Sequence, residues 1–159
     1  MYGDGYMKIG FLFAGQGSQY VGMGKDLYEK YEETRRVFDN IKLDFDVKKL
    51  CFEGPLEKLQ NTEYAQSSIL ATSMAIAEVL RSYGIVPEYV AGLSLGEYSA
   101  LCYAGAFDIE TSLSITSSIR VVIAVLLPRL PIWGRLTFPN VTLTFVFFIN
   151  KLLPMLVPA

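Results

Sequence analysis

The chain has 159 residues, of which 52% are hydrophobic and 19% are charged, and its formal net charge is -2. This length and composition are typical of one globular domain with its own apolar core. The small net charge gives no reason to expect a nucleic acid or an anionic membrane as a partner.

The first predicted element is a strand that leads into a glycine-rich loop. Lys8 to Phe13 is a short, mostly apolar run, and residues 14–19 read AGQGSQ. A short apolar run followed by glycines is typical of a buried strand and a turn. Between Asp26 and Asp44, apolar residues recur at near-helical spacing, so one or two surface helices are predicted there.

A long helix is predicted next. Asn61, Thr62 and Glu63 can cap its start, and Gly84 follows its last turn, where a left-handed residue is favoured. The apolar residues of this segment form a wide face: Ile69, Leu70, Met74, Ile76, Ala77, Leu80 and Tyr83. We therefore expect the helix to be buried on most sides.

The sequence then places a serine between a strand and a helix. Residues 87–91 predict the strand, residues 92–96 read GLSLG, and residues 97–103 predict a helix that Gly105 ends. The pattern G-x-S-x-G holds a nucleophilic serine on a strained turn, near backbone N–H groups that stabilise an oxyanion. The amide of Leu95 is the natural first donor. Alone, the pentapeptide also occurs in turns that have no catalytic function.

Strands that alternate with helices predict an α/β fold with a mostly parallel sheet. The AGQGSQ loop and the GLSLG turn each follow a predicted strand. Both are therefore expected at the carboxyl edge of the sheet, where open α/β sheets bind ligands.

Three segments, taken in order, resemble one enzyme family. They are FLFAGQGSQYVGMG (residues 11–24), NTEYAQSSILATSMAIAEVL (residues 61–80) and VAGLSLGEYSALCYAGAF (residues 90–107). They closely resemble malonyl-CoA:acyl-carrier-protein transacylases of fatty-acid synthesis and, less closely, acyltransferase domains of polyketide synthases. The resemblance runs from residue 7 to residue 115. It implies part of the family's large α/β-hydrolase-like subdomain, with the ferredoxin-like small subdomain absent.

The resemblance also implies an acyl transfer through a serine ester. Ser94 matches the nucleophile that takes malonate from malonyl-CoA and passes it to the phosphopantetheine thiol of acyl-carrier protein. Gln16 and Leu95 match the positions whose backbone amides form the oxyanion hole. Gln66 matches a glutamine near the family's pocket, although a polar contact within the helix explains it equally well. No metal or cofactor is implied, because coenzyme A only carries the substrate.

The chain departs from the family pattern in ways that predict impaired activity. Leu93 replaces the family's histidine before the serine. Ile119 stands where the family has its malonate-binding arginine, and Arg120 is one place away, which is about 100° around a helix. The sequence contains no histidine, so the family's catalytic base is missing. We expect Glu97 to cap or pack the helix rather than to replace that base.

The end of the chain differs in composition from the rest. All 16 acidic residues lie at or before Glu110, whereas 5 of the 7 prolines follow it. The apolar runs at 121–127 and 143–149 are too short to span a bilayer, so a membrane partner is not expected. We interpret residues 7–116 as a partial acyltransferase large subdomain. Residues 117–159 are interpreted as an apolar, proline-rich tail that arose from a change of reading frame near residue 116.

Cys51 and Cys102 stand apart, without the paired spacing of a zinc site or a disulfide framework. A reduced, cytoplasmic protein is therefore expected.

Two alternatives to the transacylase stay open from the sequence. A serine thioesterase or esterase would share the G-x-S-x-G turn without needing the AGQGSQ loop. A catalytically inactive fragment, which associates through an exposed sheet edge and the apolar tail, is the other.

Overall fold

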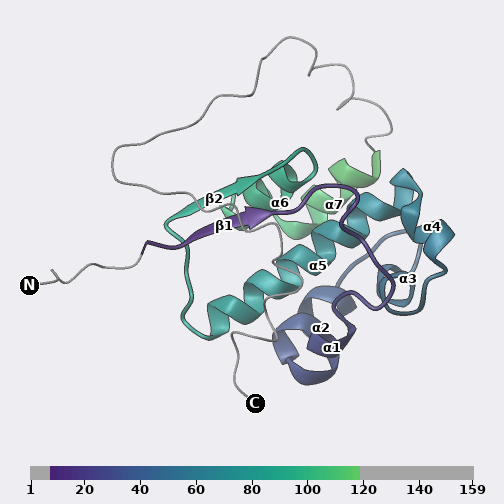
Figure 1. Cartoon of the computed structure of the whole chain (residues 1–159), viewed down its shortest axis with the longest axis horizontal. Helices are drawn as coiled ribbons and strands as arrows, with labels where there is room; N and C mark the ends of the chain where they lie inside the picture. The colour runs from purple at the N-terminus through teal and green to yellow at the C-terminus, as the bar shows by residue number, and fades with distance from the viewer. Residues whose placement is uncertain (1–7, 119–159) are drawn as a thin grey trace, which may run out of the picture.

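The computed structural model describes residues 8–118, and Figure 1 shows how their helices and strands are arranged. In chain order the elements are β1 (Gly10–Phe13), α1 (Lys25–Lys30), α2 (Glu32–Asp39), α3 (Val47–Glu53), α4 (Leu56–Gln60), α5 (Thr62–Ser82), β2 (Tyr89–Gly92), α6 (Gly96–Tyr103) and α7 (Ile109–Ser118). The predicted strands, the helices between Asp26 and Asp44, the long helix and the helix after GLSLG are all present. The tail predicted at residues 119–159 lies outside the described residues.

The two strands pair in parallel. Their register runs from Gly10 opposite Tyr89 to Phe13 opposite Gly92. The pairing continues past the ladder, because the N–H of Leu93 donates to the carbonyl oxygen of Phe13 at 3.3 Å. The predicted α/β class with a parallel sheet is thus confirmed, and the segments after β1 and β2 start at the same edge.

Helix α5 lies at the centre of the helical layer. It is buried over 14 of its 21 residues and packs against α2, α3, α4, α6 and α7. Small residues such as Ala71 and Ala75, which are fully buried, allow these helices to approach closely. The Asn61 side chain caps its start by accepting a bond from the N–H of Glu63 at 3.2 Å, and Gly84 follows its end with a φ of +74°. The predicted caps and burial are confirmed.

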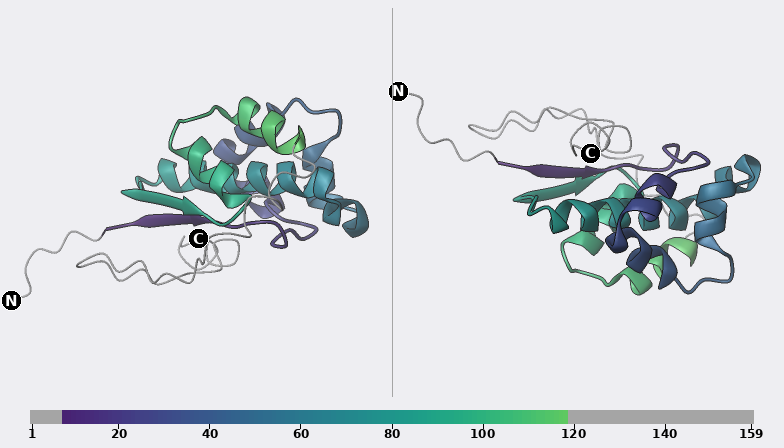
Figure 2. Two further views of the ribbon diagram at one scale, coloured as in Figure 1. Left: turned by 90° about the horizontal axis from the view of Figure 1, so that it is seen from above. Right: turned by 90° about the horizontal axis from the view of Figure 1, so that it is seen from below.

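Helix α6 connects this helical layer to the sheet. It contacts both strands as well as α5 and α7. The rings of Phe11 and Phe13 on β1 lie 5.4 and 6.0 Å from the ring of Tyr103 on α6, measured between centroids. The edge-on views of Figure 2 show the described helices on one face of the sheet. On the strand β2, Tyr89 keeps 58% of its surface exposed.

Helices α3 and α4 were not predicted from the sequence. Asp46 begins α3, and its carboxylate accepts a bond from the N–H of Lys49 at 2.8 Å. Pro55 precedes the first residue of α4, a position where its fixed φ suits a helix start. No helix among residues 8–118 is long and apolar enough to cross a membrane.

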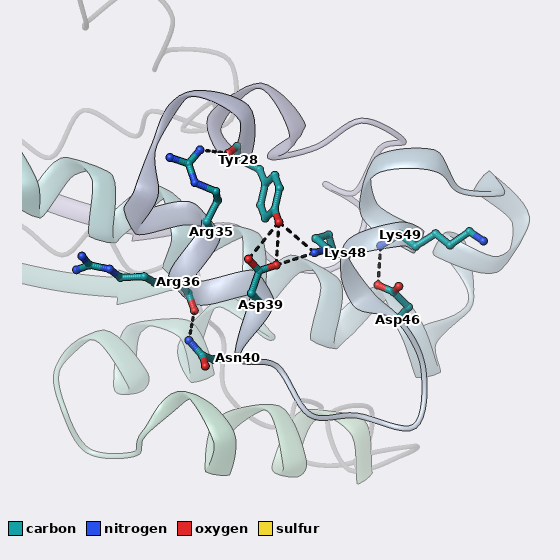
Figure 3. Close-up of polar contacts among 8 residues, drawn as sticks. All are labelled: Tyr28, Arg35, Arg36, Asp39, Asn40, Asp46, Lys48 and Lys49. Carbon is teal, nitrogen blue, oxygen red and sulfur yellow. Dashed lines mark hydrogen bonds and ion pairs between the residues drawn. The ribbon is translucent and has the colours of Figure 1, made fainter.

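A polar cluster joins the first three helices, as Figure 3 shows. The hydroxyl of Tyr28 donates to Asp39 at 2.9 Å, and the Lys48 ammonium donates to the same carboxylate oxygen at 2.6 Å. The Lys48 ammonium also lies 4.9 Å from the centre of the Tyr28 ring. Tyr28, Asp39 and Lys48 therefore tie α1, α2 and α3 together at the surface.

We expect Asp39→Asn to weaken the fold in a pH-dependent way. The hydrogen bond from Lys48, together with that from Tyr28, holds the pKa of the Asp39 carboxyl below its usual value. Its stabilising contribution is therefore complete above the unfolded-state pKa of about 3.9 and is lost as the pH falls through the folded-state pKa. Because the pair is solvent-exposed, the loss at pH 7 should be below about 1 kcal/mol.

Urea denaturation of the Asp39→Asn variant and the original chain at pH 7 and near pH 3 measures this difference. Asp44→Asn is the matched control, because no described residue forms a hydrogen bond or ion pair with the Asp44 side chain. A loss of the same size at both pH values would contradict the electrostatic role.

Candidate active site

Ser94 lies on a tight turn between β2 and α6. Its φ of +55° makes it the one non-glycine residue with a positive φ in the described part of the chain. Such a conformation strains the backbone of an L-residue, and strained residues of this kind are found most often at functional sites. The side chain is partly exposed, and α6 begins only two residues later, at Gly96. The hydroxyl is thus presented next to a helix N-terminus, where the predicted nucleophile was expected.

The two glycines that flank Ser94 are required by the packing of the backbone. A Cβ atom at Gly92 would lie 1.9 Å from the carbonyl carbon of Gly96, and one at Gly96 would lie 2.2 Å from the carbonyl oxygen of Phe13. Real Cβ atoms do not approach other atoms so closely. The turn can therefore close against β1 only when both positions lack a side chain.

The AGQGSQ loop lies against this turn. A Cβ atom at Gly15 would lie 2.6 Å from the carbonyl oxygen of Leu93 and 3.9 Å from the Cβ of Ser94. The prediction that the loop and the turn share one edge of the sheet is confirmed by these contacts. Leu93, which occupies the family's histidine position, is 63% exposed.

Among the backbone amides of the loop and turn around Ser94, those of Gln16 and Leu95 have no acceptor within residues 8–118. By contrast, the N–H of Gly17 donates to Oε1 of Gln19 at 2.8 Å, and the N–H of Gly96 donates to the carbonyl oxygen of Leu93 at 2.9 Å. Unoccupied N–H groups next to a nucleophile are able to stabilise negative charge that develops on a reacting carbonyl oxygen.

The loop is also held to α5, through a contact that sequence analysis missed. Nε2 of Gln16 donates to Oγ1 of Thr62 at 3.0 Å, across 46 positions in sequence. Within the loop, the hydroxyl of Ser18 donates to the carbonyl oxygen of Gly15 at 2.9 Å. Thr62 was expected only as part of a helix cap, and nothing in its local sequence indicates a partner so distant.

The structure does not support the structural roles that the sequence analysis considered for Gln66 and Glu97. Gln66 is only 5% exposed, yet none of the described residues forms a hydrogen bond with its side chain, so a polar contact within the helix does not explain it. Helix α6 starts after Leu95 with no side-chain cap, so the capping role predicted for Glu97 is wrong. The Glu97 carboxylate is instead exposed. Ile119 and Arg120 lie outside the described residues.

The two cysteines are poor candidates for nucleophiles. Both are buried and unpaired, and burial raises the pKa of the Cys51 thiol to about 11. Burial also raises the pKa of the Cys102 thiol. Since the reactive form is the thiolate, these thiols stay protonated and inert near neutral pH. No group of His, Cys, Asp and Glu side chains suited to a metal ion occurs in the part of the chain that the structure describes.

Two surface hollows lie away from Ser94. One is lined by residues 42–45 with Glu63 and Ser117, and the other mainly by residues of α2 and α7. Neither contains Gln16, Ser94 or Leu95. The turn at Ser94 is therefore the better candidate for the active site, because its residues can support a reaction and neither hollow includes them.

Comparison with known proteins places the chain among acyl transferases. The profile of the acyl transferase domain family matches residues 10–129. The malonyl CoA-acyl carrier protein transacylase of Bacillus subtilis (strain 168) is 49% identical over 105 residues, which are 65% of this chain and 33% of that protein. The chain thus spans about a third of the length of the curated relatives it matches.

Solved structures give the same result. The malonyl CoA-acyl carrier protein transacylase of Clostridium perfringens matches with a TM-score of 0.67 and 44% identity, covering 70% of this chain and 36% of that one. A type II polyketide synthase acyl-carrier protein in complex with its malonyl-transacylase matches with a TM-score of 0.67 and 36% identity, covering 70% of this chain and 37% of that one.

We expect Gly92→Ala to destabilise the chain by about 3 kcal/mol or more, because the added methyl group would overlap the backbone of Gly96. Gly10→Ala is the matched control on the paired strand, since its Cβ would meet nothing closer than the Tyr89 carbonyl oxygen at 3.7 Å. Alanine there should be neutral or stabilise by roughly 0.5 kcal/mol. Thermal and urea unfolding of both variants measures the difference. Equal stability of the two variants would refute the crowding at the turn.

Proposed function

The chain belongs to the acyl transferase domain family, and from this we propose that Ser94 is the nucleophile of a malonyl transfer from coenzyme A to an acyl-carrier protein. The observation that carries the proposal is the positive φ of Ser94 on a turn closed by two glycines. We propose that this turn is a nucleophile elbow, in which strain in the backbone holds a serine hydroxyl clear of the sheet.

The reaction has two steps. Oγ of Ser94 attacks the thioester carbonyl of malonyl-CoA, the new Oγ–C bond forms, the C–S bond breaks, and the coenzyme A thiol leaves with the serine proton. The phosphopantetheine thiol of the carrier protein then attacks the malonyl ester and restores the Ser94 hydroxyl. No redox change occurs, and we propose that no cofactor is needed because malonyl-CoA is itself the substrate.

The N–H groups of Gln16 and Leu95 are proposed to form the oxyanion hole. One comes from the loop after β1 and the other from the turn after β2. Their lack of acceptors within residues 8–118 supports this role. Removing one such donor from an enzyme typically lowers turnover by about 10²- to 10³-fold.

The substrate and partner are proposed from the relatives. The matched proteins are named for malonyl-CoA and acyl carrier protein, and one solved neighbour is a complex with its carrier protein. We propose that the partial large subdomain predicted at residues 7–116 is α/β-hydrolase-like and that the protein acts in the cytoplasm. The boundary at residue 116 and the change of reading frame stay predictions, and the family match extends past that boundary to residue 129.

The sequence holds no histidine, so an imidazole of this chain cannot accept the Ser94 proton. Loss of the base from a serine triad lowers turnover by about a million-fold, leaving residual catalysis by the oxyanion hole and by binding. We therefore expect acylation of Ser94 over about a day rather than within a second.

The direct test is intact-mass spectrometry of the purified chain after prolonged incubation with malonyl-CoA. We expect one malonyl adduct on the original chain and none on a Ser94→Ala variant that has the same circular dichroism spectrum. Addition of acyl-carrier protein bearing its phosphopantetheine arm should move the adduct to the carrier.

Other outcomes would contradict the proposal in different ways. An adduct that is released as free malonate, with no gain on the carrier protein, would indicate a serine thioesterase. The absence of any adduct on a folded, monodisperse sample would show that the chain keeps the family's serine but lacks its chemistry.

A further inference from the structure

The orientation of one peptide unit matters for the proposed oxyanion hole. The N–H of Gln16 and the carbonyl of Gly15 belong to the same peptide unit, which is planar and trans. In such a unit the C=O and N–H bonds point in opposite directions. A contact that fixes the Gly15 carbonyl oxygen therefore also fixes the direction of the Gln16 N–H.

The hydroxyl of Ser18 makes such a contact. It donates to the carbonyl oxygen of Gly15 at 2.9 Å, and Ser18 is partly buried in the loop. A second hydrogen bond holds the residue that follows this carbonyl, because the Gln16 side chain donates to Oγ1 of Thr62 on α5 at 3.0 Å. Gly15 is also wedged against the carbonyl oxygen of Leu93.

The contacts of Gly15 and Ser18 matter because packing at Gly17 does not fix the loop. Gly17 has a φ of +103°, and the position of its missing Cβ is open space, with nothing within 4 Å. Gly17 therefore supplies no packing that would hold the Gln16 amide in one direction. A hydrogen bond to a carbonyl also polarises the whole peptide unit, so it makes the N–H a stronger donor.

We infer that Ser18 is a positioning residue, whose hydroxyl grips the Gly15 carbonyl and so aims the Gln16 N–H at the reacting centre beside Ser94. The inference rests on the proposed function of that centre. It assigns to Ser18 no contact with substrate, and Thr62 acts as a second support through the Gln16 side chain.

The test compares Ser18→Ala with Ser18→Thr, which keeps the hydroxyl. Ser82→Ala is the matched control, because Ser82 makes the same type of bond, to the Val79 carbonyl oxygen three residues back at 2.8 Å, at the far end of α5. The rate of Ser94 malonylation is measured by mass spectrometry over a range of malonyl-CoA concentrations. Circular dichroism monitors folding of each variant.

We expect Ser18→Ala to lower the saturating rate about tenfold, a fraction of the loss for a deleted donor, and to leave the half-saturating concentration unchanged. Ser18→Thr should recover most of the rate, and Ser82→Ala should match the original chain. An unchanged rate in a folded Ser18→Ala variant, or a loss that threonine does not restore, would overturn the inference.

A second readout separates this inference from the proposed function. If the original chain forms no malonyl adduct, the proposed function fails, and the amide resonances of Gln16 and Gly17 in ¹⁵N-labelled samples decide the role of Ser18. Displacement of the Gln16 resonance in Ser18→Ala, with its return in Ser18→Thr, supports the positioning role. Superimposable spectra of Ser18→Ala and the original chain reject it.

Discussion

The close approach of three backbone segments at the carboxyl edge of the sheet governs the rest of the site. The end of β1, the loop after it and the turn after β2 meet where a Cβ atom at Gly15, Gly92 or Gly96 would lie within 2.6 Å of another backbone atom. Because no side chain fits between them, the main-chain atoms themselves build the surroundings of Ser94. Backbone N–H groups held in this way are preorganised, and the Ser18 hydroxyl adds a side-chain hydrogen bond to the Gly15 carbonyl oxygen in the same loop.

The helical layer supports this edge from one side. Helix α6 starts at the turn and packs on both strands, while α5 packs on α6 and meets the loop again through Thr62. The start of α5 and the start of α6 are therefore both tied to the site. The cluster of Tyr28, Asp39 and Lys48 lies away from the site and links α1, α2 and α3 by hydrogen bonds between side chains. The site edge depends instead on close packing of the backbone.

The sequence predicted the framework better than the details of the site. Apolar runs bounded by glycines located both strands, and the wide apolar face of residues 69–83 located α5, because burial dominates these segments. Helices α3 and α4 were not predicted because they are short and lack a strong apolar period after their capping residues, Asp46 and Pro55. Contacts such as that of Gln16 with Thr62 join residues 46 positions apart, and only the tertiary fold brings them together. The roles of Gln16, Ser94 and Leu95 remain predictions that the geometry supports.

The left-handed backbone at Ser94 has a consequence for how this gene can change. Glycine adopts a φ of +55° without steric strain, whereas serine in that conformation costs about 1–3 kcal/mol. A glycine codon is a single nucleotide away from some serine codons, so relief of this strain is readily accessible to mutation. If the protein were maintained only for the stability of this turn, selection would favour glycine at this position. Serine at this position lowers the free energy of unfolding relative to glycine. If serine persists there, selection acts on its hydroxyl group rather than on the stability of the turn.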